Sequence, residues 1–236
     1  MAATFMKMPQ LLLLLLTTLT ACTQMSQPKD ENRLQDLSEK TGIEMVVIDE
    51  AEKITGTQAE HFRRWLIRSI YAGDPIQSTI QQPAPKTKTV LLPGISFPVD
   101  PKLAEQVVDN LNRKFAYRSC IAFISDDRRE DKKNVVSLIH SFDKYNALRL
   151  QETSGGSYHF STDTLIAKLK VFEQKYPFRF IAVGNDWLTI QTVDTPKDWS
   201  EFANEVMKVC PTEEPNSQET AKNFEKEGGK VFMWWD

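Results

Sequence analysis

The stretch FRFIAVGNDWLTIQTV, residues 178–193, contains two runs of apolar residues separated by a glycine-asparagine step. Such a step between two runs of strand-forming residues indicates a tight turn, so the sequence predicts a β-hairpin that turns at Gly184-Asn185. A hairpin joins antiparallel strands, and this excludes a purely parallel sheet.

Apolar spacing predicts the elements on either side of the hairpin. Continuous apolar runs at residues 120–125 and 135–140 are typical of strands covered on both faces. A final strand is expected from residue 230 onwards. Because strands and helices alternate, we expect an α/β (α+β) fold: a mixed sheet with a β-hairpin, flanking helices and a C-terminal strand ending in Trp-Trp-Asp. Helical spacing or end signals predict helices at residues 103–111, 165–172, 199–206 and 217–227.

The region before residue 90 has weaker signals. The short apolar run at residues 43–48 predicts a strand, and residues 57–70 predict a helix because Thr57 and Glu60 have the spacing of a capping box. Residues 72–89 are rich in Gln, Pro, Thr and Lys, which is typical of an exposed linker. We therefore expect an N-terminal appendage and linker at 43–89 and the α/β domain at 90–236.

The opening segment has the pattern of an export signal. A membrane-spanning helix needs about 20 apolar residues, whereas the run LLLLLLTTLTACTQ, residues 11–24, is shorter and is diluted by threonines. Lys7 precedes the leucines and small residues follow them, as in a signal peptide. The run ends in Leu19-Thr20-Ala21-Cys22, which resembles the lipobox of bacterial lipoproteins; an uncleaved anchor is the alternative interpretation.

The lipobox implies processing, lipidation and a location. We expect a signal peptide at 1–21, starting at Met1 or at Met6, and a polar tether at 22–42. Acyl chains such as palmitate on Cys22 would hold the protein on the cell membrane, with its domain facing the periplasm. Thr23 stands where an inner-membrane retention signal has aspartate, so the outer membrane is favoured in a Gram-negative cell.

Composition limits the class of partner. Apolar residues make up 41% and charged residues 26% of the chain, as is ordinary for a globular protein. The formal net charge is −3 and no dense basic patch is present, so nucleic acid is not an expected partner. Export would permit a disulfide between Cys120 and Cys210, but both lie in apolar contexts and are favoured as buried free thiols.

Three segments resemble a known bacterial family. SYHFSTDTLIAKLKVFEQKY (157–176), FIAVGNDWLTIQTVDTPKDWSEFANEVMKVCP (180–211) and the terminal FMWWD are similar to the domain-of-unknown-function 4253 family, over roughly Leu91 to Asp236. Members typically have Asn-Tyr where this chain has Ser157-Tyr158, and an acid after Cys-Pro where it has Thr212. The resemblance implies a shared fold but no known activity, and part of any catalytic set is missing from this chain.

Standard catalytic signatures are absent from the sequence, and the three histidines lie at no metal-ligand spacing. We expect no cofactor and no metal. The alternative is a metal site that the fold assembles from His140, His159 and Cys210, which are distant in sequence. The candidate catalytic residues are Asp186, Tyr158 and Asp236. Asp186 lies beside Trp187, Tyr158 offers a hydroxyl, and Asp236 follows two tryptophans.

Each candidate also has a structural interpretation. An aspartate in a turn bonds its own backbone, a tyrosine before a helix packs its ring, and the final tryptophans pack into the core on both sides of the strand.

Two functions from different classes fit these features. The first is a lipid-anchored binding or interaction protein that recognises a protein or another component of the cell envelope. The second is an envelope hydrolase that uses Asp186 with Tyr158 or Asp236 in one cleft. The anchor and the missing catalytic motifs favour the first, a protein that is not an enzyme, and the hydrolase stays open as the alternative.

Overall fold

The computed structural model describes residues 28–66, 88–125, 133–211 and 217–235. Within these ranges the chain forms seven α-helices and seven β-strands. In chain order they are α1 (Pro28–Thr41), α2 (Met45–Thr55), β1 (Glu60–Leu66), β2 (Lys88–Val99), α3 (Ala104–Phe115), β3 (Cys120–Ser125), β4 (Asn134–His140), α4 (Asn146–Gln151), α5 (Thr162–Lys175), β5 (Phe178–Val183), β6 (Trp187–Thr192), α6 (Trp199–Val209), α7 (Ser217–Lys226) and β7 (Lys230–Trp234).

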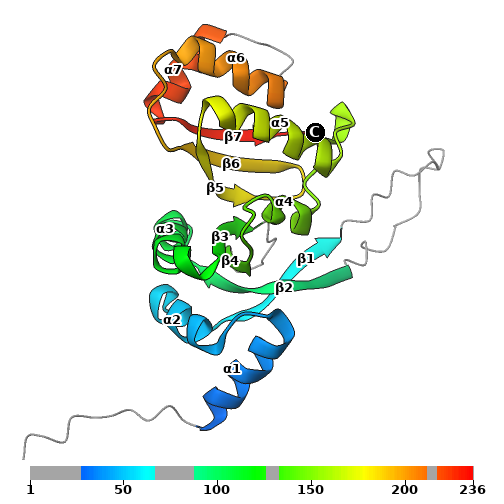
Figure 1. Ribbon diagram of the computed structural model, residues 1–236, viewed down its shortest axis with the longest axis vertical. Helices are drawn as coiled ribbons and strands as arrows, with labels where there is room; N and C mark the ends of the chain where they lie inside the picture. The colour runs from blue at the N-terminus through cyan, green and yellow to red at the C-terminus, as the bar shows by residue number, and fades with distance from the viewer. Residues whose placement is uncertain (1–27, 67–87, 126–132, 212–216, 236) are drawn as a thin grey trace, which may run out of the picture.

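All seven strands belong to one open sheet, in the order β1-β2-β4-β3-β5-β6-β7. Neighbouring strands are antiparallel except for β3 and β5, which are parallel. The mixed sheet is thus confirmed, and so is the hairpin formed by β5 and β6. Helices α1, α2 and α3 lie near β1 to β4, whereas α5, α6 and α7 gather around β5, β6 and β7 (Figure 1).

The hairpin turn depends on a glycine. The Gly184 N–H donates to the Trp187 carbonyl at 2.8 Å, and the Trp187 indole lies directly over Gly184. A Cβ atom at position 184 would approach the indole Nε1 to 2.3 Å. This turn therefore requires glycine for lack of space rather than for its backbone angles.

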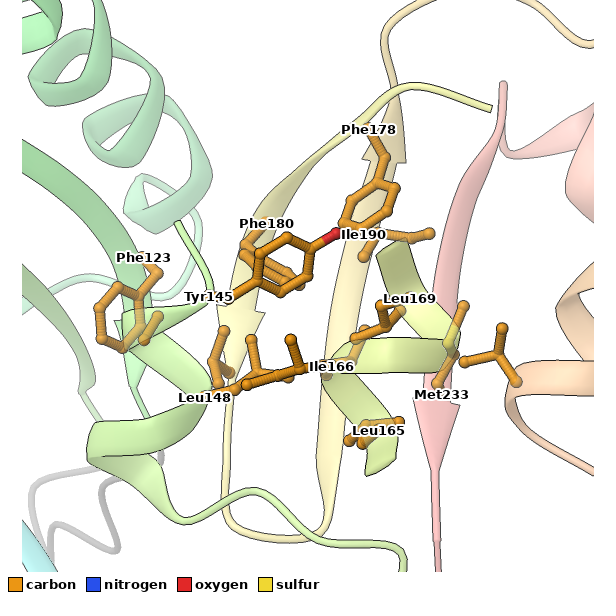
Figure 2. Close-up of a cluster of buried hydrophobic side chains, with 14 of the residues drawn as sticks. Phe123, Tyr145, Leu148, Leu165, Ile166, Leu169, Phe178, Phe180, Ile190 and Met233 are labelled. Atoms are coloured by element: carbon orange, nitrogen blue, oxygen red, sulfur yellow. The ribbon is translucent and has the colours of Figure 1, made fainter. Parts of the chain in front are cut away.

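One face of the sheet is covered by α4, α5 and α6. Their apolar side chains pack on strand residues that include Phe178, Phe180, Ile190 and Met233 (Figure 2). Figure 2 shows Leu165, Ile166 and Leu169 of α5 among the side chains of this cluster. Aromatic rings are frequent here, and several meet edge to face, as with Tyr145 and Phe180 at 5.8 Å between ring centroids.

The opposite face is covered over only part of its width. Helices α1, α2 and α3 bury an apolar cluster on this face, mainly against β2, β4 and β3. Over β6 and β7 the side chains of Phe232 and Trp234 remain 64% and 53% exposed. The described helices therefore leave this part of the face open.

Two predicted elements before residue 90 were wrong. Residues 43–48, predicted as a strand, lie at the start of helix α2, because Val47, Ile48 and Ala51 continue an apolar stripe at helical spacing. Gly56, with φ of 69°, ends this helix. A short apolar run does not distinguish strand from helix until its continuation is considered.

The predicted helix at 57–70 contains strand β1 instead. Backbone pairing with β2 aligns Arg63 with Leu91 and buries Phe62 completely. Long-range pairing thus overrides the local capping-box signal. The segment predicted as an appendage therefore contributes an edge strand to the sheet. The predicted tether includes α1, whose Leu37 is buried, and residues 67–87 of the predicted linker lie outside the described residues.

Cys120 and Cys210 are both free and buried, as predicted. Burial raises the pKa of both thiols, so neither is activated as a thiolate nucleophile. None of the helices in the described ranges is both long and apolar enough to cross a bilayer.

A charged network fastens α4 and α5 to β5. The Tyr145 hydroxyl donates to Glu173 at 2.7 Å, and Lys144 pairs with the same carboxylate and donates to the Phe178 carbonyl at 2.5 Å. Lys144 also lies 3.8 Å from the centre of the Phe178 ring. Burial, followed by the hydrogen bond to Glu173, raises the pKa of Tyr145.

The Gly184→Ala variant is expected to unfold at lower temperature, with a loss of about 1–3 kcal/mol in the free energy of unfolding from overpacking against Trp187. Thermal and urea unfolding measure this loss. In a Trp187→Ala background the same substitution should cost clearly less, since the indole is gone. Equal costs in both backgrounds would contradict the steric explanation.

The Tyr145→Phe variant tests the network through pH. At pH 8 the free energy of unfolding of the wild type should exceed that of the variant by about 2 kcal/mol, because the variant lacks the hydrogen bond to the charged Glu173. The pKa of Tyr145 is raised in the folded state, so above pH 10 the unfolded chain loses a proton that the folded chain keeps. The advantage of the wild type should therefore shrink above pH 10. An advantage that is constant from pH 8 to 11 would contradict the network.

Candidate functional site

Tyr158 lies in a short 3₁₀ turn at Gly156–Tyr158, just before α5. Its hydroxyl donates to the Pro211 carbonyl at 2.9 Å, and its ring stacks on Phe160 with 6.0 Å between centroids. The hydroxyl thus ties the turn to the segment that follows α6, and the ring packs within the turn region itself.

Asp186 occupies the hairpin turn between β5 and β6. Its backbone carbonyl accepts from the Trp235 N–H at 2.8 Å. Its carboxylate forms no hydrogen bond within the described residues and is half-exposed. The contribution of Asp186 that the structure displays is therefore made by its backbone.

The end of β7 joins the same region. Trp235 is fully buried, and its indole N–H donates to the Val209 carbonyl at 3.2 Å. The Cys210 thiol donates to the Trp234 carbonyl at 3.3 Å. The prediction that both tryptophans pack into the core was wrong for Trp234, because alternation along the strand directs it to the open face.

Four segments that resemble the family thus meet at one end of the sheet. They are the turn at Tyr158, the hairpin turn at Asp186, the Cys210-Pro211 step and the end of β7, joined by the hydrogen bonds above. The hydroxyl of Tyr158 is bonded to backbone rather than to the Asp186 carboxylate. Asp236 and Cys22 lie outside the described residues.

A pocket of about 620 Å³ lies elsewhere, on the partly open face of the sheet. Ile124, Ile181 and Ala182 provide its apolar surface, and Trp187 and Phe232 line it with aromatic rings. Ile181 and Ala182 both reach this face because the pairing of β5 and β6 shifts between Phe180 and Ala182. The register shift is a β-bulge, a feature that redirects side chains.

Polar side chains complete the pocket. Glu105 of α3 forms an ion pair with Lys230 of β7 across it. Asn134, Asn223 and Glu227 also line the pocket, and their side chains make no hydrogen bond within the ranges that the structure describes. The pocket therefore offers amide and carboxylate groups that are available to a ligand.

Sequence reasoning did not identify this pocket. Its lining comes from α3, β3, β4, β5, β6, α7 and β7, which are distant in sequence. The sequence did contain a pattern that could have placed Phe232 on the opposite face from the core. Along the strand it alternates with the apolar residues Val231, Met233 and Trp235. As to metals, the described part of the chain contains no group of three or more His, Cys, Asp or Glu side chains placed to hold an ion.

Residues 135–236 match the family model described as domain of unknown function DUF4253. This match covers less than half of the chain. No curated protein and no solved structure matches the chain. The matched region contains the four segments joined at the end of the sheet, whereas Glu105, Ile124, Ser125 and Asn134 of the pocket precede it. The pocket is therefore formed jointly by the matched region and the segment before it.

Substitutions at the joined turns should affect stability according to the bonds described above. Tyr158→Phe is expected to lower the free energy of unfolding by about 1 kcal/mol, the usual net contribution of one hydrogen bond. Asp186→Ala, which leaves the backbone bond in place, should change it by less than about 0.5 kcal/mol. Urea unfolding of both variants measures this; a larger loss for Asp186→Ala would mean that its carboxylate has a partner.

Proposed function

We propose that the protein is a lipid-anchored binding protein of the cell envelope, attached through Cys22 and binding its ligand in the pocket that Trp187 and Phe232 line. The pocket carries this proposal. It combines an apolar surface, exposed aromatic rings and uncommitted amide and carboxylate groups, which is the usual composition of a binding site.

The lipobox supports attachment to the cell membrane. Leu19-Thr20-Ala21-Cys22 follows a run of leucines that is too short to span a bilayer. Each buried CH₂ of an acyl chain contributes about 0.8 kcal/mol, so two or more chains on Cys22 would give stable attachment. Residues 23–27 and α1 would then connect the lipid to the sheet.

An envelope hydrolase that uses Asp186 with Tyr158 or Asp236 is the alternative, favoured by the uncommitted carboxylate of Asp186. It has less support, because Tyr158 would have to give up its bond to Pro211 to act as an acid. General acid–base catalysis also needs both groups within hydrogen-bond reach of one substrate atom.

Metabolic labelling with a fatty-acid analogue tests the anchor, combined with membrane fractionation. We expect label and membrane association in the wild type and loss of both in Cys22→Ala. Cys120→Ala is the matched control, since it removes a different cysteine and should keep the label. Absence of label from all three chains, or a Cys22→Ala chain that stays in the membrane, would contradict the proposal.

A further inference from the structure

The open face of the sheet carries a row of aromatic side chains. Trp187 on β6 lies directly opposite Trp234 on β7, and Phe232 is two residues before Trp234 on the same face. The ring centroids of Trp187 and Phe232 are 6.0 Å apart, with 36° between the ring planes. These three residues, the aromatic row, form a platform rather than a closed cage: Trp187 and Phe232 line the pocket, and Trp234 continues the row beyond it.

Gly184 and the strand pairing hold the row in place. The Trp187 indole rests on Gly184, which fixes one end of the platform. The neighbouring residues Leu188, Val231 and Met233 are buried on the other face, so the two strands cannot rotate without exposing the core. A platform that is rigid before binding loses little conformational entropy when a ligand stacks on it.

The polar groups beside the row suit a ligand with several hydroxyls. Asn223 comes from α7, Glu227 follows directly after that helix, and Asn134 comes from the start of β4. An amide both donates and accepts hydrogen bonds, and a carboxylate accepts several. Asn223 and Glu227 are exposed to solvent. A ligand that covers them must replace their bonds to water, which a purely apolar ligand such as a fatty acid cannot do.

The charge of the lining disfavours anionic ligands. The charged residues of the lining are Glu105, Glu227 and Lys230, and the ammonium of Lys230 is paired with Glu105. The carboxylate of Glu227 is thus the uncompensated charge among the described lining residues. Phosphate or carboxylate groups of a ligand would meet repulsion rather than a cation.

We propose that the pocket binds a neutral saccharide, one ring of which stacks on Trp187 and Phe232 while its hydroxyls bond to Asn223 and Glu227. A pyranose ring has an apolar C–H face and a rim of hydroxyls, so it satisfies both kinds of surface at once. The volume of about 620 Å³ lies within the range of small-molecule sites. This inference rests on the proposed binding function and names its ligand class.

Tryptophan fluorescence of the full chain, purified in detergent, tests the proposal with chitotriose, cellotriose and maltotriose as probes. We expect saturable binding of at least one of them, with a change in emission as the ligand covers Trp187. Phe232→Ala should weaken that binding about tenfold through loss of stacking. Phe142→Ala is the matched control, because Phe142 is 92% exposed but does not line the pocket.

Glu227→Gln separates hydrogen bonding from charge. It should weaken binding of the neutral saccharide and increase binding of an anionic one, hyaluronan tetrasaccharide. Lack of saturable binding by all three neutral probes would overturn the proposal, as would equal effects of Phe232→Ala and Phe142→Ala. Oleate or hyaluronan binding that Phe232→Ala abolishes would also overturn the ligand class while leaving the proposed binding function intact.

Discussion

The contact between Gly184 and the Trp187 indole is the constraint on which the rest of the structure depends. Because position 184 has no side chain, the indole can close the hairpin turn, and the turn then presents the Asp186 carbonyl to Trp235. The same contact places Trp187 beside Phe232 on the open face. One packing requirement thus connects the joined turns to the pocket.

The two ends of this connection have different characters. At the joined turns, a tyrosine hydroxyl, a thiol, an indole N–H and backbone groups all bond to one another. These bonds satisfy the groups and leave little for a substrate. In the pocket, by contrast, Asn223 and Glu227 have no partner within the described residues. Helix α3 is held at the rim of the pocket by two ion pairs, Glu105–Lys230 and Asp109–Arg179. The joined turns therefore hold the fold together, whereas the open face keeps polar groups that have no partner among the described residues.

Much of the fold after residue 90 was predictable from the sequence, because its helices and strands are indicated by local patterns. The hairpin, the strands at 120–125 and 135–140, and the helix capped by Asp198 each carry apolar spacing or an end signal within a few residues. Strand β1 was not predictable in this way. It is a strand because β2, beyond residues 67–87, pairs with it. Locally, Thr57 before the strand and Glu60 at its start suggest the start of a helix instead. The pocket was also unpredictable because it depends on long-range contacts. It exists because α3 covers the sheet over β3 and β4 but does not extend over β6 and β7.

Crosslinking in living cells tests most directly whether the open face is the functional surface. A phenylalanine that carries a diazirine on its ring would replace Phe232 in one chain, so that the aromatic ring is kept, and the exposed His159, beside Tyr158, in another. The account predicts that irradiation attaches envelope glycan to the chain with the probe at position 232 and leaves the chain with the probe at 159 unmodified. Glycan or substrate attached at 159 and not at 232 would contradict it and place the function at the joined turns.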